Sequence, residues 1–168
     1  MELLKLATEW AKAEVFSTRF FIYFAIFFLA ASAGFWQLGK TDLAKAYTIP
    51  MLIAGLLLLT IGLGLFYTNK NRITQFEKAY SLDKVAFKDA EITRAESTLK
   101  EYSTVVFKAI PILICIAALC ILFFDGPKGR AYSITAIAML VVILLVDGTA
   151  HARITNYYKQ LKTIELKK

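Results

Sequence analysis

Residues 46–69 read AYTIPMLIAGLLLLTIGLGLFYTN, a run of 24 residues without a single charged side chain. An α-helix rises about 1.5 Å per residue, so a run of this length can cross the roughly 30 Å hydrocarbon core of a bilayer. A second uncharged run of 20 residues, Phe20–Gly39, lies shortly before it in the chain. The two runs predict a pair of membrane-spanning helices joined by a short polar turn.

Two further apolar runs follow, and each contains polar residues. Residues 102–124 include one charged residue, Lys108, while residues 131–152 include Asp147 and the only histidine, His151. The uncharged part of each run is 16 residues long, which is short for a spanning helix. We therefore expect Lys108 and Asp147 at the edge of the hydrocarbon region or just inside it.

The composition excludes a water-soluble bundle. The chain has 168 residues, the size of one domain, and 58% of them are hydrophobic, above the share in ordinary globular proteins. Four apolar runs leave too little polar sequence to cover them in water. The predicted fold class is all-α: an integral membrane four-helix bundle made of two transmembrane hairpins.

The only long water-compatible segment, Asn69–Ser103, separates the two hairpins and contains neither Pro nor Gly. Apolar residues continue through it at helical spacing, which predicts that the second and third helices extend out of the membrane and break near residues 81–83. We expect one membrane domain over 1–168, divided into a first hairpin at 1–74, a helical connection at 75–101 and a second hairpin at 102–168.

The two ends of the chain also have amphipathic patterns. Apolar Leu3, Leu6 and Trp10 alternate with charged residues at helical spacing, which predicts a helix lying in the membrane interface with Trp10 as its anchor. A secretory signal peptide is the alternative, because Ala31-Ser32-Ala33 has the form of a cleavage site. The 19 residues before the apolar run are long for such a signal, so we favour an uncleaved helix over about residues 17–38. Residues 153–168 are expected to form an amphipathic C-terminal tail.

Proline and glycine mark the expected irregularities. The second helix is expected to begin near Pro50, since proline is tolerated in a first helical turn. Pro111 is expected to kink the third helix. Residues 125–129, DGPKG, have the composition of a turn.

The distribution of basic residues predicts the orientation. Of the 20 Lys and Arg, sixteen lie at the chain ends and in the centre, while the two turns hold four: Lys40, Lys45, Lys128 and Arg130. The positive-inside rule then places both termini and the centre in the cytoplasm, and the chain as a multi-pass protein in the cell's inner (cytoplasmic) membrane. Attraction to anionic lipid headgroups accounts for the net charge of +7. Nucleic acid is not expected as a partner, because the basic residues flank the spans and no reader motif occurs.

Three short matches suggest that the hairpins are tandem copies. Phe16-Ser17-Thr18 corresponds to Tyr102-Ser103-Thr104, Lys45–Ile49 to Arg130–Ile134, and Arg72-Ile73-Thr74 to Arg153-Ile154-Thr155. The offsets are 86, 85 and 81 residues, so the last change removes close to one helical turn and keeps the helix face. The prediction is a parallel repeat with its pseudo-twofold axis along the membrane normal.

Small residues predict where helices approach closely in the first hairpin. Ala30 and Gly34 form a small-xxx-small pair, and Gly55, Gly62 and Gly64 lie on the second helix. Such residues let helix backbones come together in lipid.

Catalytic and metal-binding motifs are scarce. Ser, His and Asp residues form no defensible triad, one His cannot build a multi-His metal site, and no phosphate-binding glycine loop occurs. Cys115 and Cys120 are five residues apart on one expected helix and so point to different faces, as small core residues would. We expect no enzyme activity, no cofactor and no metal.

The exception is an intramembrane polar group of Lys108, Asp147 and His151. Positions 108 and 147 are equally far from the turn at 127–128, so the two charges are expected at one depth, where intramembrane charges normally pair. A structural salt bridge with a snorkelling lysine is one interpretation. A proton or ion relay that includes His151, one turn after Asp147, is the other.

The functional expectation is a non-enzymatic accessory subunit or scaffold of a membrane complex, bound to a protein partner or to a second copy as an oligomer. The alternative is a small transporter or channel subunit that uses Lys108, Asp147 and His151. An enzyme acting on lipid ranks third.

Overall fold

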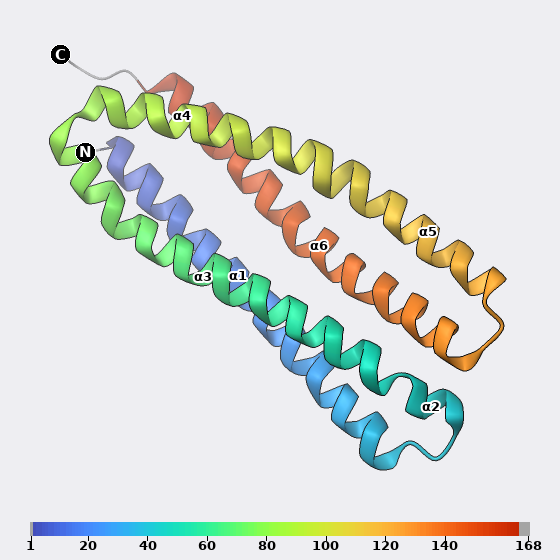
Figure 1. Cartoon of the computed structure of the whole chain (residues 1–168). Coiled ribbons are helices and arrows are strands. Elements are labelled where there is room, and N and C mark those ends of the chain that lie inside the picture. The colour runs from blue at the N-terminus through green and yellow to red at the C-terminus, as the bar shows by residue number, and fades with distance from the viewer. Residues whose placement is uncertain (1, 165–168) are drawn as a thin grey trace.

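The computed structural model describes residues 2–164, which form helices joined by short connections. Figure 1 shows an elongated antiparallel bundle. Residues 2 and 164 and the α3–α4 junction lie at one end, here called the terminal end, and the other two connections lie at the opposite turn end. The elements are α1 (Glu2–Leu38), α2 (Asp42–Ala46), α3 (Thr48–Leu82), α4 (Lys84–Glu101), the π-helix η1 (Tyr102–Ala109), α5 (Ile110–Phe123) and α6 (Pro127–Thr163).

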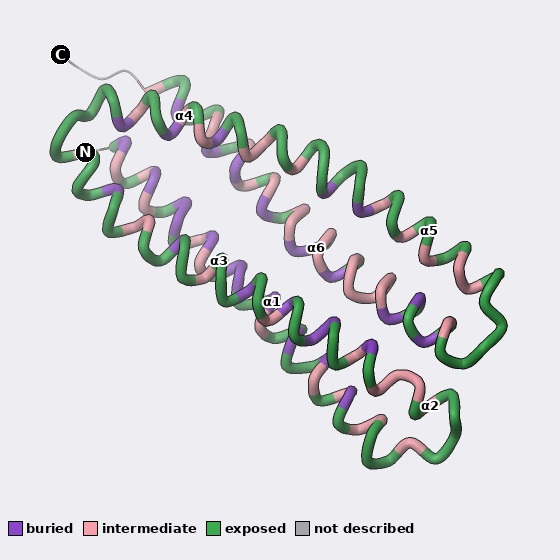
Figure 2. Tube along the Cα trace, in the orientation of Figure 1, coloured by how far each residue is buried: buried purple, intermediate pink, exposed green. Residues whose placement is uncertain are grey.

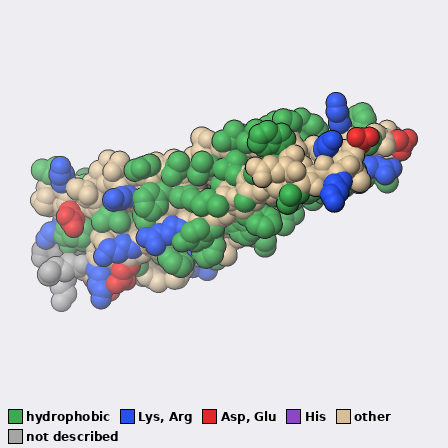
Figure 3. Space-filling model, turned by 90° about the horizontal axis from the view of Figure 1, so that it is seen from below, with side chains coloured by type: hydrophobic (Ala, Val, Ile, Leu, Met, Phe, Trp, Pro, Cys, Tyr) green, Lys and Arg blue, Asp and Glu red, His purple; other side chains and the backbone are tan. Residues whose placement is uncertain are grey.

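Four helical segments are long and apolar enough to cross a membrane: Glu2–Leu38, Asp42–Leu82, Lys84–Phe123 and Pro127–Thr163. Each has 37 to 41 residues, and 37 residues of helix measure about 56 Å, well beyond a hydrocarbon core of about 30 Å. On the face seen in Figure 3, hydrophobic side chains cover the middle of the bundle and charged side chains gather toward its two ends. This is the arrangement of a multi-pass membrane protein.

The amino-terminal segment differs from the expected interfacial helix. Helix α1 runs without interruption from Glu2 to Leu38, and Leu3, Ala7, Trp10 and Ala11 are buried inside the bundle. The apolar stripe of residues 3–18 therefore packs on other helices and not along a lipid surface. Trp10 stacks on Tyr157 of α6, with ring centroids 5.0 Å apart.

The expected break near residues 81–83 is confirmed. Helix α3 ends at Leu82, and Asp83 caps α4, where its carboxylate accepts hydrogen bonds from the backbone N–H groups of Val85 and Ala86 at 2.8 and 3.0 Å. A side-chain oxygen at this position satisfies donors that the first helical turn leaves free. Both α3 and α4 thus extend beyond the apolar runs, as the sequence predicted.

The connections at the turn end are more helical than expected. Residues 42–46 form the short helix α2, whose first turn is capped by the Thr41 hydroxyl oxygen. The predicted turn at 125–129 is confined to residues 124–126, because α6 begins at Pro127. Proline suits a first helical position, where its missing N–H would have no intrahelical partner.

A π-helix, which no pattern in the sequence predicted, separates α4 from α5. In η1 the backbone bonds run five residues back, so the N–H of Ile110 donates to the carbonyl of Val105. Pro111 follows directly, and in a regular helix its ring would clash with the carbonyl four residues earlier. The wider π-turn accommodates this proline and changes the face that α4 presents relative to α5.

Two hydrophobic cores hold the helices together. Figure 2 shows buried residues recurring along α1 and α6, while most of α5 is exposed or intermediate. The terminal core comprises Leu3, Ala7, Trp10, Ala11, Phe76, Phe87, Ala95, Ile154, Tyr157 and Leu161. The membrane core comprises Phe21, Ala25, Phe28, Ala54, Leu58, Val142 and Val146. Among the described buried core residues, α5 contributes only Ile110, so its membrane portion is the most exposed of the four spans.

The tandem duplication stays a prediction. Each hairpin has an element that the other lacks: α2 in the first and η1 in the second.

Candidate functional site: a polar cavity between the two cores

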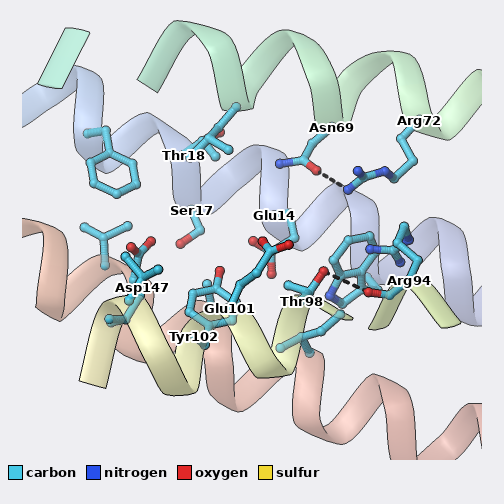
Figure 4. Close-up of a pocket in the computed structure, with 18 residues that line it drawn as sticks. Glu14, Ser17, Thr18, Asn69, Arg72, Arg94, Thr98, Glu101, Tyr102 and Asp147 are labelled. Atoms are coloured by element: carbon cyan, nitrogen blue, oxygen red, sulfur yellow. Dashed lines mark hydrogen bonds between the residues drawn. The ribbon is translucent and has the colours of Figure 1, made fainter. Parts of the chain in front are cut away.

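A cavity of about 500 Å³ lies between the terminal core and the membrane core. Trp10 and Ile154 of the terminal core and Phe21 and Val146 of the membrane core line it. The walls come from α1, α3, α4 with η1, and α6, which Figure 4 shows around the cavity. The cavity therefore lies where each of the four helices changes from apolar to polar sequence.

Two arginines and a tryptophan form the wall nearest the terminal end. The guanidinium carbon of Arg94 lies 4.3 Å from the Trp10 ring centroid, and that of Arg72 lies 5.6 Å from it. Arg72 also donates a 2.9 Å hydrogen bond to Oδ1 of the buried Asn69. Arginine over an aromatic face is a favourable contact of about 1 kcal/mol or more where water is excluded. Burial, and then the nearby charge of Arg94, lower the pKa of Arg72.

Behind this wall, Glu91 connects α4 to α6. Its carboxylate accepts two bonds from Arg94, at 2.9 and 2.6 Å, and a third of 2.7 Å from the hydroxyl of Tyr157. Glu91 is only 5% exposed, so these partners are what makes its burial tolerable. Burial, and then the Glu91 carboxylate, raise the pKa of Tyr157 and keep its hydroxyl protonated as a donor.

A second ion pair joins the two hairpins across the bundle. Arg153 of α6 donates to both carboxylate oxygens of Glu14 on α1, at 3.0 and 3.4 Å. Glu14 is 7% exposed and lines the cavity. A bidentate pair of this kind fixes the rotation of both helices as well as their separation.

The end of the cavity toward the membrane core carries polar groups that form no hydrogen bond or ion pair in the described structure. Asp147 of α6, Ser17 of α1 and Tyr102 of η1 point into the same space in Figure 4. Ser17 is only 5% exposed, yet its hydroxyl forms no hydrogen bond within residues 2–164. Glu101 adds a second carboxylate to this wall.

The three predicted polar residues, Lys108, Asp147 and His151, form no side-chain hydrogen bond or ion pair with one another in the described structure. Asp147 lines the cavity, whereas the side chain of Lys108 is exposed on η1 and forms no ion pair with any described residue. His151 lies against the rings of Tyr102 and Phe107, with centroids 5.7 and 4.9 Å away. The salt bridge anticipated between Lys108 and Asp147 does not occur in this structure.

The glycines of the first hairpin fall into two groups. A Cβ at Gly55 would lie 2.8 Å from Cγ of Leu29, and one at Gly62 would lie 2.9 Å from Cβ of Phe21, so α1 and α3 approach closely at both positions. A Cβ at Gly34 or at Gly64 would meet nothing within 4 Å. Ala30 is exposed. The small-xxx-small pair of Ala30 and Gly34 is therefore not part of a contact between the described helices.

Several cavity residues escaped the sequence analysis. No site role was predicted for Glu14, Arg72, Arg94 or Glu101, but all four line the cavity. A signal was present on α1, because Glu14 and Ser17 lie four and seven residues after Trp10 and therefore share its helix face. No comparable pattern identifies Arg153 as the partner of Glu14, since the two residues are 139 positions apart.

Other polar residues of the spans are satisfied locally or are isolated. The Ser32 hydroxyl donates to the carbonyl of Thr48, and that of Thr60 to the carbonyl of Leu56. Thr135 is buried, and its hydroxyl has no partner in the described part of the chain. Within residues 2–164, no group of three or more His, Cys, Asp or Glu side chains could hold a metal ion.

Comparisons with known proteins give no relative. No protein-family model, no curated protein and no solved structure matches this chain.

Proposed function

We propose that this chain is a non-enzymatic accessory or scaffold subunit of a complex in the cytoplasmic membrane, with the terminal end in the cytoplasm. The excess of Lys and Arg at that end supports the orientation through the positive-inside rule. The protein would act by presenting its cytoplasmic helices to a protein partner or to a second copy of itself.

The α3–α4 tip carries the proposal. Leu82 is 87% exposed and Val85 is 58% exposed on either side of the capping residue Asp83. The tip lies 14 residues beyond Thr68, where the apolar part of α3 ends, and 14 helical residues span about 21 Å. Lipid tails do not reach this distance, so a protein surface is the natural cover for these side chains.

The packing of the membrane core favours this role over transport. Large apolar side chains from α1, α3 and α6, such as Phe21, Leu58 and Val142, fill the bundle between the cavity and the turn end. A small transporter or channel subunit is nevertheless the second candidate, because Asp147 lines a polar cavity next to the membrane core. If the purified protein carries protons or ions across proteoliposome membranes and the Asp147→Asn substitution abolishes this flux, the result would favour transport over the scaffold role.

The native mass of the complex tests the scaffold proposal. Membranes of the native host would be extracted in a mild detergent, and the extracts sized under native conditions. We expect the wild-type chain in a particle heavier than a single copy, and the Leu82→Asp/Val85→Asp double variant to run as a single copy.

A matched control is Leu43→Asp, which changes an exposed leucine of α2 at the turn end and should leave the mass unchanged. Because Leu82 and Val85 are exposed, both variants should keep the wild-type unfolding transition. A wild-type protein that already runs as a single copy, or a double variant of unchanged mass, would refute the proposal.

A further inference from the structure

From the unpartnered groups of the cavity we infer that it binds a primary ammonium group attached to an apolar body. The inference does not depend on the scaffold proposal. It follows from which cavity groups are already satisfied, which are not, and how the two kinds are distributed along the bundle.

Two of the charged side chains at the terminal end of the cavity are held in ion pairs, whereas Arg72 forms no ion pair with any residue from 2 to 164. Arg94 is paired with Glu91, and Glu14 is paired with Arg153. Arg72 is held by its hydrogen bond to Asn69 and by the face of Trp10. At this end the guanidinium of Arg72 is unpaired and the buried indole N–H of Trp10 has no hydrogen-bond partner among the described residues, so this end does not favour a cation.

The opposite end has two carboxylates and two hydroxyl groups without partners. Asp147 and Glu101 form no ion pair or hydrogen bond with any residue from 2 to 164, and neither does the side-chain hydroxyl of Ser17 or that of Tyr102. Ser17 is 95% removed from solvent and points into the cavity in Figure 4. Its hydroxyl is accessible from the cavity and is not used by the protein, so a ligand in the cavity can form a hydrogen bond with it.

These four groups match the chemistry of a primary ammonium. The ammonium carries three N–H donors and one positive charge, while carboxylate and hydroxyl oxygens accept hydrogen bonds. An anionic ligand would instead meet two uncompensated negative charges. The aromatic ring of Tyr102 adds a surface that is compatible with a cation.

The remaining lining favours an apolar body on the ligand. Phe21, Leu65, Val105, Val106 and Val146 line the part of the cavity next to the membrane core. A volume of about 500 Å³ is within the range of small-molecule sites. Two sources supply this chemistry: a soluble amphipathic amine, or a membrane lipid with an ethanolamine headgroup.

Trp10 provides a direct readout of binding, because it lines the cavity, whereas Trp36 is exposed on the turn-end half of α1. In a Trp36→Phe background, we expect hexylamine to change the emission of Trp10 saturably in detergent, and hexanesulfonate, with the same chain length, to cause no saturable change. Asp147→Asn should weaken hexylamine binding at least tenfold. Asp125→Asn, at an exposed carboxylate of the turn end, should leave the binding unchanged.

Two further variants keep the test valid if Asp147→Asn does not fold. Glu101→Gln changes an exposed wall residue, and Ser17→Ala removes the unpartnered hydroxyl; each should weaken hexylamine binding several-fold. Equal binding of hexylamine and hexanesulfonate, or unchanged hexylamine binding in all three cavity variants, would overturn the inference.

Nanodiscs separate the two sources of the ammonium group. If the ligand is a lipid, the apparent dissociation constant for hexylamine should be higher in nanodiscs that contain phosphatidylethanolamine than in nanodiscs of phosphatidylcholine alone. Equal constants would assign the site to a soluble amine.

Discussion

The carboxylate of Glu91 should be the most sensitive polar position in the terminal half of the bundle. Glu91→Leu removes the acceptor of three hydrogen bonds and leaves the guanidinium of Arg94 without its counter-ion. Breaking a buried ion pair in this way costs about 3–5 kcal/mol. The side chain of Arg94 is 22% exposed and would keep its contact with Trp10, so we expect a cost at the lower end of this range. The lost bond from Tyr157 adds about 1 kcal/mol, for a total of about 4 kcal/mol.

Equilibrium unfolding in mixed detergent micelles, followed by the loss of helical circular dichroism, measures this cost. Glu96→Leu is the matched control, because Glu96 lies on the same helix in an exposed pair with Lys100 at 3.8 Å. Exposed pairs of this type contribute less than about 1 kcal/mol. The double change Glu91→Leu/Arg94→Leu should recover part of the loss, since the main cost is the unpaired charge. Equal costs for Glu91→Leu and Glu96→Leu would refute the role assigned to this network.

Three further predictions follow from the same structure. Burial and the Glu91 carboxylate raise the pKa of Tyr157, so folding favours its protonated form. The free energy of unfolding should fall as the pH rises above the ordinary tyrosine pKa of about 10, and in the same assay that of the Tyr157→Phe variant should fall less steeply. Gly55→Leu should lower the unfolding midpoint because α1 and α3 would have to separate, while Gly34→Leu should leave it nearly unchanged; equal effects would contradict the assigned contacts. Reporter fusions after Gly39 and Lys128 should face the outside, and fusions after Lys84 and Lys168 the cytoplasm; an external Lys84 would reverse the proposed orientation.

The sequence predicted the structural features that depend on a single helix. Run length identified the four spans, and helical spacing through residues 69–103 predicted extended helices with a break next to Asp83. These features depend on local hydrophobicity and capping, which can be read from neighbouring residues.

The sequence was less informative about side-chain environments, because these depend on which surface packs against each helix face. The stripe that includes Trp10 suits either a lipid interface or another protein surface, and the packing of Tyr157 decides between them. Equal depth placed Lys108 and Asp147 at one level, but depth does not specify the direction of a side chain around its helix. Lys108 lies on the π-helix with its side chain exposed, while Asp147 points into the cavity.

The π-helix gives the chain a constraint on length as well as on composition. Helices α4 and α5 form one continuous rod, but η1 sets their side-chain stripes out of phase with each other. Deleting one residue from 102–109 would turn α4 by about 100° relative to α5. Tyr102 and Glu101 would then leave the cavity wall, although every side chain that lines it could still be present in the sequence. A single substitution in this segment keeps the rotation of α4 relative to α5, whereas a single deletion changes it. Substitutions should therefore be tolerated far more often than deletions.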